Sequence, residues 1–396
     1  MARHGYEGLP RAVPEDVGMS TSRLGRIAPV MQGWIDDGKI PCALTMIARE
    51  GRLVHFEKFG MQDIAAAKPI EFNSIFRLYS MTKPITSVAV MMLYEEGHFQ
   101  LNTPVSEFVP AFKDMKVYTE DGSAVVDAER EVTIKHLLTH TTGLIYESDR
   151  EDHPIDQRYE DADLYGGNLA NMIQKLGGIP LLHQPGTAWK YGMSTDVLGY
   201  LVGVVSGMPF ETFLKTRIFN PLGMNDTGFS VRVEDADRYS KVYEFGEDGA
   251  LQEIENIHAA TGPLSFFHSG GGGLQSTAAD YLRFCQMLLN GGELDGVRLL
   301  GRKTAELIKM SHVPADWLAP GRTGTGFGLG FAVVTDVAET HTLGSVGPCS
   351  WGGMASTTFW IDPVEALIGI FMTQLVGADS PFHAQFRVLT YQSIVG

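Results

Sequence analysis

A serine and a lysine three residues apart, Ser80 and Lys83, open a helix-like segment and constrain this chain more than any other feature. Apolar residues follow at helical spacing, at positions 85, 88, 89, 92 and 93, and Gly97 ends the pattern. A side chain at the start of a helix lies beside free backbone N–H groups, which favour developing negative charge. Lys83 is predicted on the same face, one turn further along. Such a pair can make a serine hydroxyl nucleophilic without a histidine.

Two distant segments accompany this pair. Tyr191 lies in the segment Pro-Gly-Thr-Ala-Trp-Lys-Tyr-Gly-Met-Ser at residues 185–194, and Trp351 opens a Trp-Gly-Gly segment inside a predicted strand pair. A nucleophile helix, then a tyrosine, then a Gly-rich strand edge resembles the serine β-lactamase and penicillin-binding superfamily. Within it, the chain is most similar to the class C β-lactamase-like esterases, the family VIII carboxylesterases. The resemblance covers roughly residues 20 to 390 and includes segments at 136–144, 221–227 and 270–281.

Composition narrows the functional class. With 396 residues, of which 44% are hydrophobic, the chain can bury a large core. Its net charge of −16 argues against nucleic acid and anionic membranes as partners, because both need a basic surface. The first twenty residues lack the apolar stretch of a secretory signal, no apolar run is long enough to span a bilayer, and three scattered cysteines predict no disulfide framework. We therefore expect a cytoplasmic enzyme, and the resemblance implies a small-molecule ester substrate and no cofactor.

Strand patterns lie toward both ends of the chain and helical patterns lie mostly between them. The strands are expected at 43–49 and 53–59, as a hairpin, and at 327–336, 341–346, 354–361 and 366–373; helices are expected at 194–206, 209–219, 277–289 and 382–394. The implied α/β (α+β) fold is an antiparallel sheet flanked by helices, with an inserted mainly helical lobe. We expect residues 1–20 to form an N-terminal arm and residues 21–396 one catalytic unit. Its α/β lobe would take about 21–80 and 310–396, with the active site in the cleft between the lobes.

The resemblance implies a mechanism and a set of site residues. Ser80 would attack an ester carbonyl and form an acyl-enzyme, which water then hydrolyses. Lys83 and Tyr191 are the candidates for the general base, and the sequence leaves open which of the two holds the proton. The backbone N–H groups of Ser80 and Met354 would form the oxyanion hole. The residues expected to contact substrate are Trp351, Gly352, Gly353, Met193 and Tyr146.

Two departures from the β-lactamase pattern decide the expected substrate. Those enzymes carry an asparagine two residues after the tyrosine and a lysine at the start of the Gly-rich motif, whereas this chain has Met193 and Trp351. Each lost polar contact removes about 1.5–3 kcal/mol of preferential binding. A neutral, short acyl ester therefore fits best. The alternatives are a weak β-lactamase or D-amino-acid peptidase, an acyltransferase, and, least favoured because Ser80, Lys83 and Tyr191 are intact, a non-enzymatic binding protein.

Four other segments carry weaker signals. Residues 268–270, His-Ser-Gly, imitate the Gly-rich motif but precede the predicted strand pair, so we expect a loop. Residues 343–347 nearly match a nucleophile elbow but lack its strand-turn-helix context. His136 and His140 lie four residues apart, yet no third ligand is apparent and we expect no metal. Residues 147–164 hold eight acidic and two basic side chains, which indicates either a solvated loop or a flap that repels anionic substrates.

Overall fold

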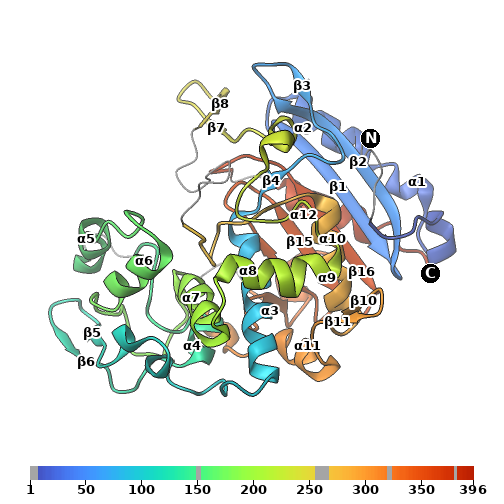
Figure 1. Ribbon diagram of the computed structural model, residues 1–396. Coiled ribbons are helices and arrows are strands. Elements are labelled where there is room, and N and C mark those ends of the chain that lie inside the picture. The colour runs from blue at the N-terminus through green and yellow to red at the C-terminus, as the bar shows by residue number, and fades with distance from the viewer. Residues whose placement is uncertain (1–7, 149–152, 255–266, 319–322, 379–380) are drawn as a thin grey trace.

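The centre of the molecule is an eight-stranded antiparallel sheet (Figure 1), in a computed structural model that describes residues 8–148, 153–254, 267–318, 323–378 and 381–396. The strand order is β12-β13-β14-β15-β16-β1-β2-β3. The bounds are β1 Cys42–Arg49, β2 Arg52–Asp63, β3 Lys68–Pro69, β12 Thr325–Phe327, β13 Ala332–Val334, β14 Cys349–Gly352, β15 Thr358–Asp362 and β16 Leu367–Met372. The expectation of an antiparallel sheet flanked by helices is confirmed.

The two ends of the chain meet in the middle of this sheet. β1 pairs with β2 through a tight hairpin and with β16 on its other side, in a register that runs from Leu44 opposite Met372 to Arg49 opposite Leu367. Every residue of β1 is buried, as is usual for a central strand covered by helices on both faces. Near the termini, the Gly396 N–H donates to the Gly18 carbonyl over 3.1 Å.

Helices cover both faces of the sheet (Figure 1). On one face, α2 (Ile27–Asp36) and α12 (Phe382–Tyr391) pack against the alternate side chains of β1 and β16, so that Ile47 and Phe371 belong to this core. On the other face, α10 (Ala278–Leu289) packs on β15 and β16. The large main core continues from that face into the helices beyond it.

The middle of the chain forms a mainly helical region beside the sheet (Figure 1). Its central contact is between α3 (Thr82–Glu95) and α7 (Ser194–Ser206), which brings the start of each helix to one place. The other helices are α1 Thr21–Leu24, α4 Ile134–Leu138, α5 Pro154–Asp161, α6 Leu169–Leu176, α8 Phe210–Leu214, α9 Asn220–Leu222 and α11 Arg302–Ile308. Short strand pairs join β4 (Phe76–Arg77) to β9 (Gln275–Ser276), β5 (Lys116–Tyr118) to β6 (Val125–Asp127), β7 (Tyr243–Phe245) to β8 (Leu251–Glu253), and β10 (Glu293–Leu294) to β11 (Val297–Arg298).

Several predicted strands are wrong in detail. Residues 341–346 form a loop, because His341 has a φ of 53° and ends a short helical turn. The strand expected over 327–336 splits into β12 and β13, and Gly330, with a φ of 93°, reverses the chain between them. The strand expected from residue 354 begins at Thr358, because Ser356 (φ 61°) closes a turn onto the Gly353 carbonyl. The helix expected over 209–219 is also interrupted, by a π-helical turn at Lys215–Phe219.

Two further expectations concern cysteines and membranes. Cys42, Cys285 and Cys349 are all free and buried. Among the described residues, no single helix is long and apolar enough to cross a bilayer; α7 and the helical run Phe210–Leu222 pass by length and composition together, but they bend by 81° at their junction.

One buried carboxylate makes a testable stability prediction. Asp280, in the first turn of α10, accepts hydrogen bonds from the Asp226 N–H (2.8 Å) and the Thr227 hydroxyl (2.9 Å), yet burial raises its pKa to about 6. An aspartate in the unfolded chain has a pKa of about 3.9, so this group contributes stability below that pH and loses it as the pH rises through about 6. Relative to Asp280→Asn, the free energy of unfolding of the wild type should fall by about 2–3 kcal/mol between pH 4 and 7. Urea unfolding of both proteins across this range measures the difference, and a difference independent of pH contradicts the prediction.

Candidate active site

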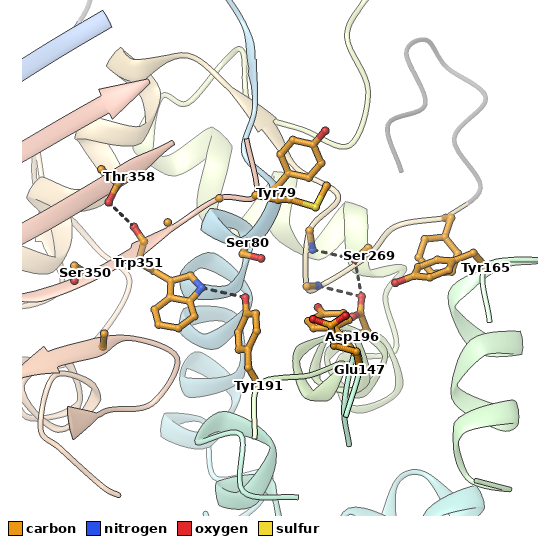
Figure 2. A pocket seen from close by; sticks show the side chains of 18 residues that line it. Tyr79, Ser80, Glu147, Tyr165, Tyr191, Asp196, Ser269, Ser350, Trp351 and Thr358 are labelled. Atoms are coloured by element: carbon orange, nitrogen blue, oxygen red, sulfur yellow. Dashed lines mark hydrogen bonds between the residues drawn. The ribbon is translucent and has the colours of Figure 1, made fainter. Parts of the chain in front are cut away.

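A pocket of about 690 Å³ lies where the turn before α3, strands β13 to β15 of the sheet and the helical region meet (Figure 2). Ser80, Tyr146 and Tyr191 line it from the helical side, and the backbone of residues 351–354 lines it from β14 and the turn that follows. The sequence motifs, which are far apart along the chain, therefore converge on one cavity. This cavity is the candidate active site.

Ser80 lies in a short 3₁₀ turn, Tyr79–Met81, directly before α3. The preceding Tyr79 has a φ of 47°, a conformation that bulky residues rarely adopt and that persists only where its surroundings hold it. This turn places Ser80 on the pocket surface, while the first residues of α3 are buried. The serine therefore faces the cavity from just before the N-terminus of a helix whose next side chains point into the core.

Lys83 is almost completely buried, with 1% of its surface exposed. Its Nζ lies 3.1 Å from Ser80 Oγ, 3.0 Å from the Tyr146 hydroxyl and 2.8 Å from the Gly271 carbonyl oxygen. An ammonium group would donate to all three oxygens. A neutral amine would donate to Tyr146 and Gly271 only, and its lone pair would then point at the Ser80 hydroxyl. The geometry can thus hold a base in place for the serine proton.

Tyr191 adjoins Lys83 through its ring rather than through its hydroxyl. The Lys83 Nζ lies 4.7 Å from the centre of the Tyr191 ring, and the Tyr191 hydroxyl accepts a hydrogen bond from Trp351 Nε1 over 3.2 Å. Because the tryptophan N–H occupies one lone pair, the hydroxyl hydrogen of Tyr191 can turn toward a substrate. The tyrosine hydroxyl that hydrogen-bonds the lysine is that of Tyr146.

Tyr146 and His140 complete the surroundings of the lysine. Burial, reinforced by the nearby Asp196, raises the pKa of Tyr146 well above its usual value, so its phenol stays neutral and accepts the lysine N–H. Burial, and secondly the charge of Lys83, holds the pKa of His140 well below its usual value. Its Nδ1 accepts the Gly192 N–H (3.4 Å), while His136 Nδ1 accepts the Thr133 N–H in a helix cap. The described residues include no cluster of three metal-ligating side chains.

The expected oxyanion donors are open to the cavity. Within the described part of the chain, neither the Ser80 N–H nor the Met354 N–H donates to any acceptor, whereas the Gly353 N–H is bound to the Thr357 carbonyl over 2.8 Å. A side chain at Gly353 is excluded, because its Cβ would lie 2.4 Å from the Leu78 carbonyl oxygen. That close approach seats the residues after β14 against the chain just before the nucleophile turn, where two N–H groups can face one carbonyl oxygen.

The two departures from the β-lactamase pattern lie in different environments. Trp351 lines the pocket and packs against Tyr191 and Phe327, with ring centres 5.3 Å away in each case. Met193 does not line the pocket: only 4% of its surface is exposed, and it packs in the main core. Besides Tyr191, Asp196 faces the pocket from this part of the chain, in the first turn of α7.

Sequence reasoning missed Asp196, the buried carboxylate of the pocket. Asp196 Oδ1 accepts hydrogen bonds from the Ser269 hydroxyl (2.6 Å) and the Gly271 N–H (3.1 Å). Ser269 belongs to the segment at 268–270, which is a loop as expected but still lines the cavity. In the sequence, the only indication that Ser269 belongs to the site was the likeness of residues 268–270 to the Gly-rich motif. In the acidic segment, Glu147 lines the pocket and α5 occupies Pro154–Asp161, so it is not a continuous loop; residues 149–152 lie outside the described part.

Comparisons with known proteins agree with this geometry. A family model described as "Beta-lactamase" matches residues 26–392. Protein Rv1367c of Mycobacterium tuberculosis (strain ATCC 25618 / H37Rv) is 34% identical over 352 residues, covering 86% of this chain and 87% of that protein. Esterase EstB of Burkholderia gladioli is 29% identical over 395 residues, covering 94% and 96%. Among solved structures, "EstCE1, a hydrolase with promiscuous acyltransferase activity" superposes with a TM-score of 0.81 at 27% identity, covering 93% of this chain and 99% of that one.

Proposed function

Because this chain belongs to the β-lactamase family and is a serine hydrolase, we propose that it is a carboxylesterase that cleaves short-chain esters through an acyl-enzyme on Ser80. The observation that carries the proposal is the 3.1 Å contact between Lys83 Nζ and Ser80 Oγ at the base of the pocket. Two of its relatives, EstB and EstCE1, are named esterase and hydrolase. Both support ester hydrolysis as the reaction class.

In the acylation step, Lys83 takes the Ser80 proton as Oγ attacks the ester carbonyl. The carbonyl oxygen becomes an oxyanion, and the N–H groups of Ser80 and Met354 stabilise it. When the bond to the alcohol breaks, the leaving oxygen needs a proton. Tyr191 would donate it, and the hydrogen bond that its oxygen accepts from Trp351 Nε1 supports this role because it leaves the hydroxyl hydrogen free for the leaving group. Because Lys83 Nζ contacts the ring of Tyr191 and not its hydroxyl, the proton returns from Lys83 to Tyr191 by way of solvent in the pocket, and the two residues act as one functional unit.

Deacylation repeats these steps with water in place of the alcohol. Water loses a proton to the Lys83–Tyr191 pair and attacks the acyl carbonyl; Ser80 Oγ leaves and regains its proton from Lys83. The products are a carboxylic acid and the regenerated serine. The neutral phenol of Tyr146 and the Gly271 carbonyl keep the lysine aligned through both halves of the reaction.

The pocket lining supports esters over β-lactams. Its described lining contains six aromatic side chains and two carboxylates, and no lysine, arginine or histidine to attract the carboxylate of a β-lactam. We expect kcat/KM for p-nitrophenyl butyrate to exceed that for a chromogenic cephalosporin by about 10²-fold or more, equivalent to roughly 2.7 kcal/mol. Steady-state rates of wild type and Ser80→Ala on both substrates test this. Equal efficiency on the two substrates would overturn the assignment.

A second activity, acyl transfer to an alcohol, has one specific observation in its favour. EstCE1, whose structure matches 93% of this chain, is described as having promiscuous acyltransferase activity. The chemistry differs only in the nucleophile that removes the acyl group from Ser80. Product analysis after incubation with a vinyl ester and an alcohol in water would measure the ratio of transfer to hydrolysis.

A further inference from the structure

We propose that the Asp196 side of the pocket binds an ammonium group carried by the ester substrate. The inference deepens the proposed esterase function and rests on it. Figure 2 shows Asp196, Glu147, Ser269 and Tyr165 on one side of Ser80 and Trp351 on the other. The pocket is therefore asymmetric: one side is apolar, and the opposite side carries negative charge.

The carboxylate of Asp196 supplies the buried negative charge on this side of the pocket. Only 2% of its surface is exposed, yet it lines the pocket. Its hydrogen-bond partners, the Ser269 hydroxyl and the Gly271 N–H, both donate to Oδ1, the arrangement that a carboxylate accepts. Within the described chain Oδ2 accepts no hydrogen bond, and no lysine, arginine or histidine lines the pocket to pair with it. A buried carboxylate with one unused oxygen is costly unless a donor or a cation arrives.

Gly271 keeps space open at this oxygen. A Cβ at residue 271 would lie 2.6 Å from Asp196 Oδ2 and 3.1 Å from the Tyr146 hydroxyl oxygen. The φ of Gly271 is not in the left-handed region, so the backbone conformation does not require a glycine. The need is for space between the carboxylate and the phenol. Any side chain here would crowd that oxygen.

Three aromatic rings line the same side of the pocket as the carboxylate. Tyr165 and Phe267, whose ring centres are 5.4 Å apart, line the same pocket, and Asp196 is close enough to Tyr165 to help raise the pKa of that phenol. Tyr146 is the third ring. The faces of aromatic rings attract cations, and enclosure strengthens that attraction. Rings with a buried carboxylate behind them are the chemistry that recognises an alkylated ammonium rather than an anion.

The test uses ester pairs that differ only in charge. Choline butyrate carries a trimethylammonium group, and 3,3-dimethylbutyl butyrate places a neutral tert-butyl group in its position. We expect wild-type kcat/KM to be at least tenfold higher for the choline ester. A second pair, ethyl betaine and ethyl 3,3-dimethylbutanoate, carries the charge on the acyl side. A preference in either pair supports the site and tells which part of the substrate enters it; no preference in both overturns it.

The decisive variant is Asp196→Asn, which preserves shape and removes charge. The selectivity ratio is kcat/KM for the cationic ester divided by kcat/KM for the neutral ester, and we expect it to be at least fivefold lower in this variant than in the wild type. The intrinsic reactivities of the two esters cancel in that comparison. Glu107→Gln is the matched control, because Glu107 is an exposed acid outside the pocket lining and solvent screens its charge. Its ratio should change less than twofold. An Asp196→Asn ratio equal to that of the wild type contradicts the proposal.

A binding measurement on the wild type tests the ammonium site even if Asp196→Asn does not fold. It also separates the ammonium proposal from the esterase proposal. Choline should inhibit wild-type hydrolysis of p-nitrophenyl butyrate competitively, with a Ki at least tenfold below that of 3,3-dimethylbutan-1-ol; equal Ki values reject the ammonium site while esterase activity stands. Calorimetric titration of choline into Ser80→Ala reports the site even if no ester is cleaved. Choline binding without Ser80-dependent hydrolysis would reject the esterase and keep the cation site, and heat no greater than that of the neutral alcohol would reject the site itself.

Discussion

Replacement of Lys83 by alanine is expected to lower kcat for ester hydrolysis by 10³-fold or more, about 4 kcal/mol of transition-state stabilisation. The reason is geometric: Lys83 Nζ lies 3.1 Å from Ser80 Oγ, and Tyr146 and Gly271 orient it. Replacement of Ser80 by alanine should be at least as damaging. Lys303→Ala is the matched control, because the side chain of Lys303 is 79% exposed and, within the described residues, pairs only with Glu306 on the surface of α11.

Covalent labelling separates the roles of these two residues. A fluorophosphonate should add a single mass label, mapped to Ser80 by peptide sequencing and absent in Ser80→Ala. In Lys83→Ala the same label should form slowly, because the nucleophile remains and only its base is lost. A label that persists in Ser80→Ala rules out the mechanism. So does a label on Ser345, the serine of the segment at 343–347 that nearly matches a nucleophile elbow. Labelling of Lys83→Ala at the wild-type rate shows that the lysine is not the base.

The second large effect concerns Tyr191. Tyr191→Phe keeps the ring contacts with His140 and Trp351 and removes only the hydroxyl, and we expect kcat to fall about 10³-fold for alkyl esters. The alcohol of an alkyl ester is a poor leaving group and needs a proton, whereas p-nitrophenolate leaves without one. The loss for a p-nitrophenyl ester should therefore be much smaller. Measurement of kcat for ethyl and p-nitrophenyl butyrate in the wild type and this variant tests the assignment.

Tyr146→Phe provides the contrast. Its hydroxyl accepts a hydrogen bond from Lys83 and stays neutral, so its removal disturbs the base and should slow both esters by similar factors. Equal losses for both esters in Tyr191→Phe would assign Tyr191 to the serine proton instead of the leaving group. Nearly full activity of Tyr191→Phe on ethyl butyrate would exclude the tyrosine from catalysis. The double variant of Lys83 and Tyr191 should lose far less than the product of the single losses, because the two residues act as a unit.

The parts of this molecule that were predictable from sequence are the local ones. The serine–lysine helix, the hairpin of β1 and β2 and the helix α7 are encoded by spacing within a few turns or strands, and they lie close to where the sequence places them. The loop after β13 was wrongly predicted as a strand, because Leu343 and Val346 suggested one while His341, with a φ of 53°, turns the chain. Apolar residues indicate a strand only where the backbone can stay extended.

Of the site, the sequence predicted the residues that lie in motifs but not the neighbours that tertiary packing brings to them. Motif order led to Ser80, Lys83 and Tyr191, but nothing local relates Lys83 to Tyr146, 63 residues further on, or to Gly271, 188 residues further on. Met193 shows the opposite error, since its position in the motif suggested the pocket while its side chain packs in the core. Asp196 had no signal of its own within an amphipathic helix. Which face of α7 meets the cavity is decided by its packing on α3, and that contact is tertiary.

The pairing of the first strand with the last has a consequence during protein synthesis. β1 leaves the ribosome early, yet its partner β16 follows roughly 320 residues later, so about 15–65 s pass between them at 5–20 residues per second. During that time β1, whose residues are all buried in the finished sheet, lacks its neighbour and most of its cover. The nascent chain carries Ser80 and Lys83 long before it can seat them beside β14. A growing polypeptide of this design is catalytically silent until its last strands emerge, and chaperones have the whole interval in which to bind its exposed edge.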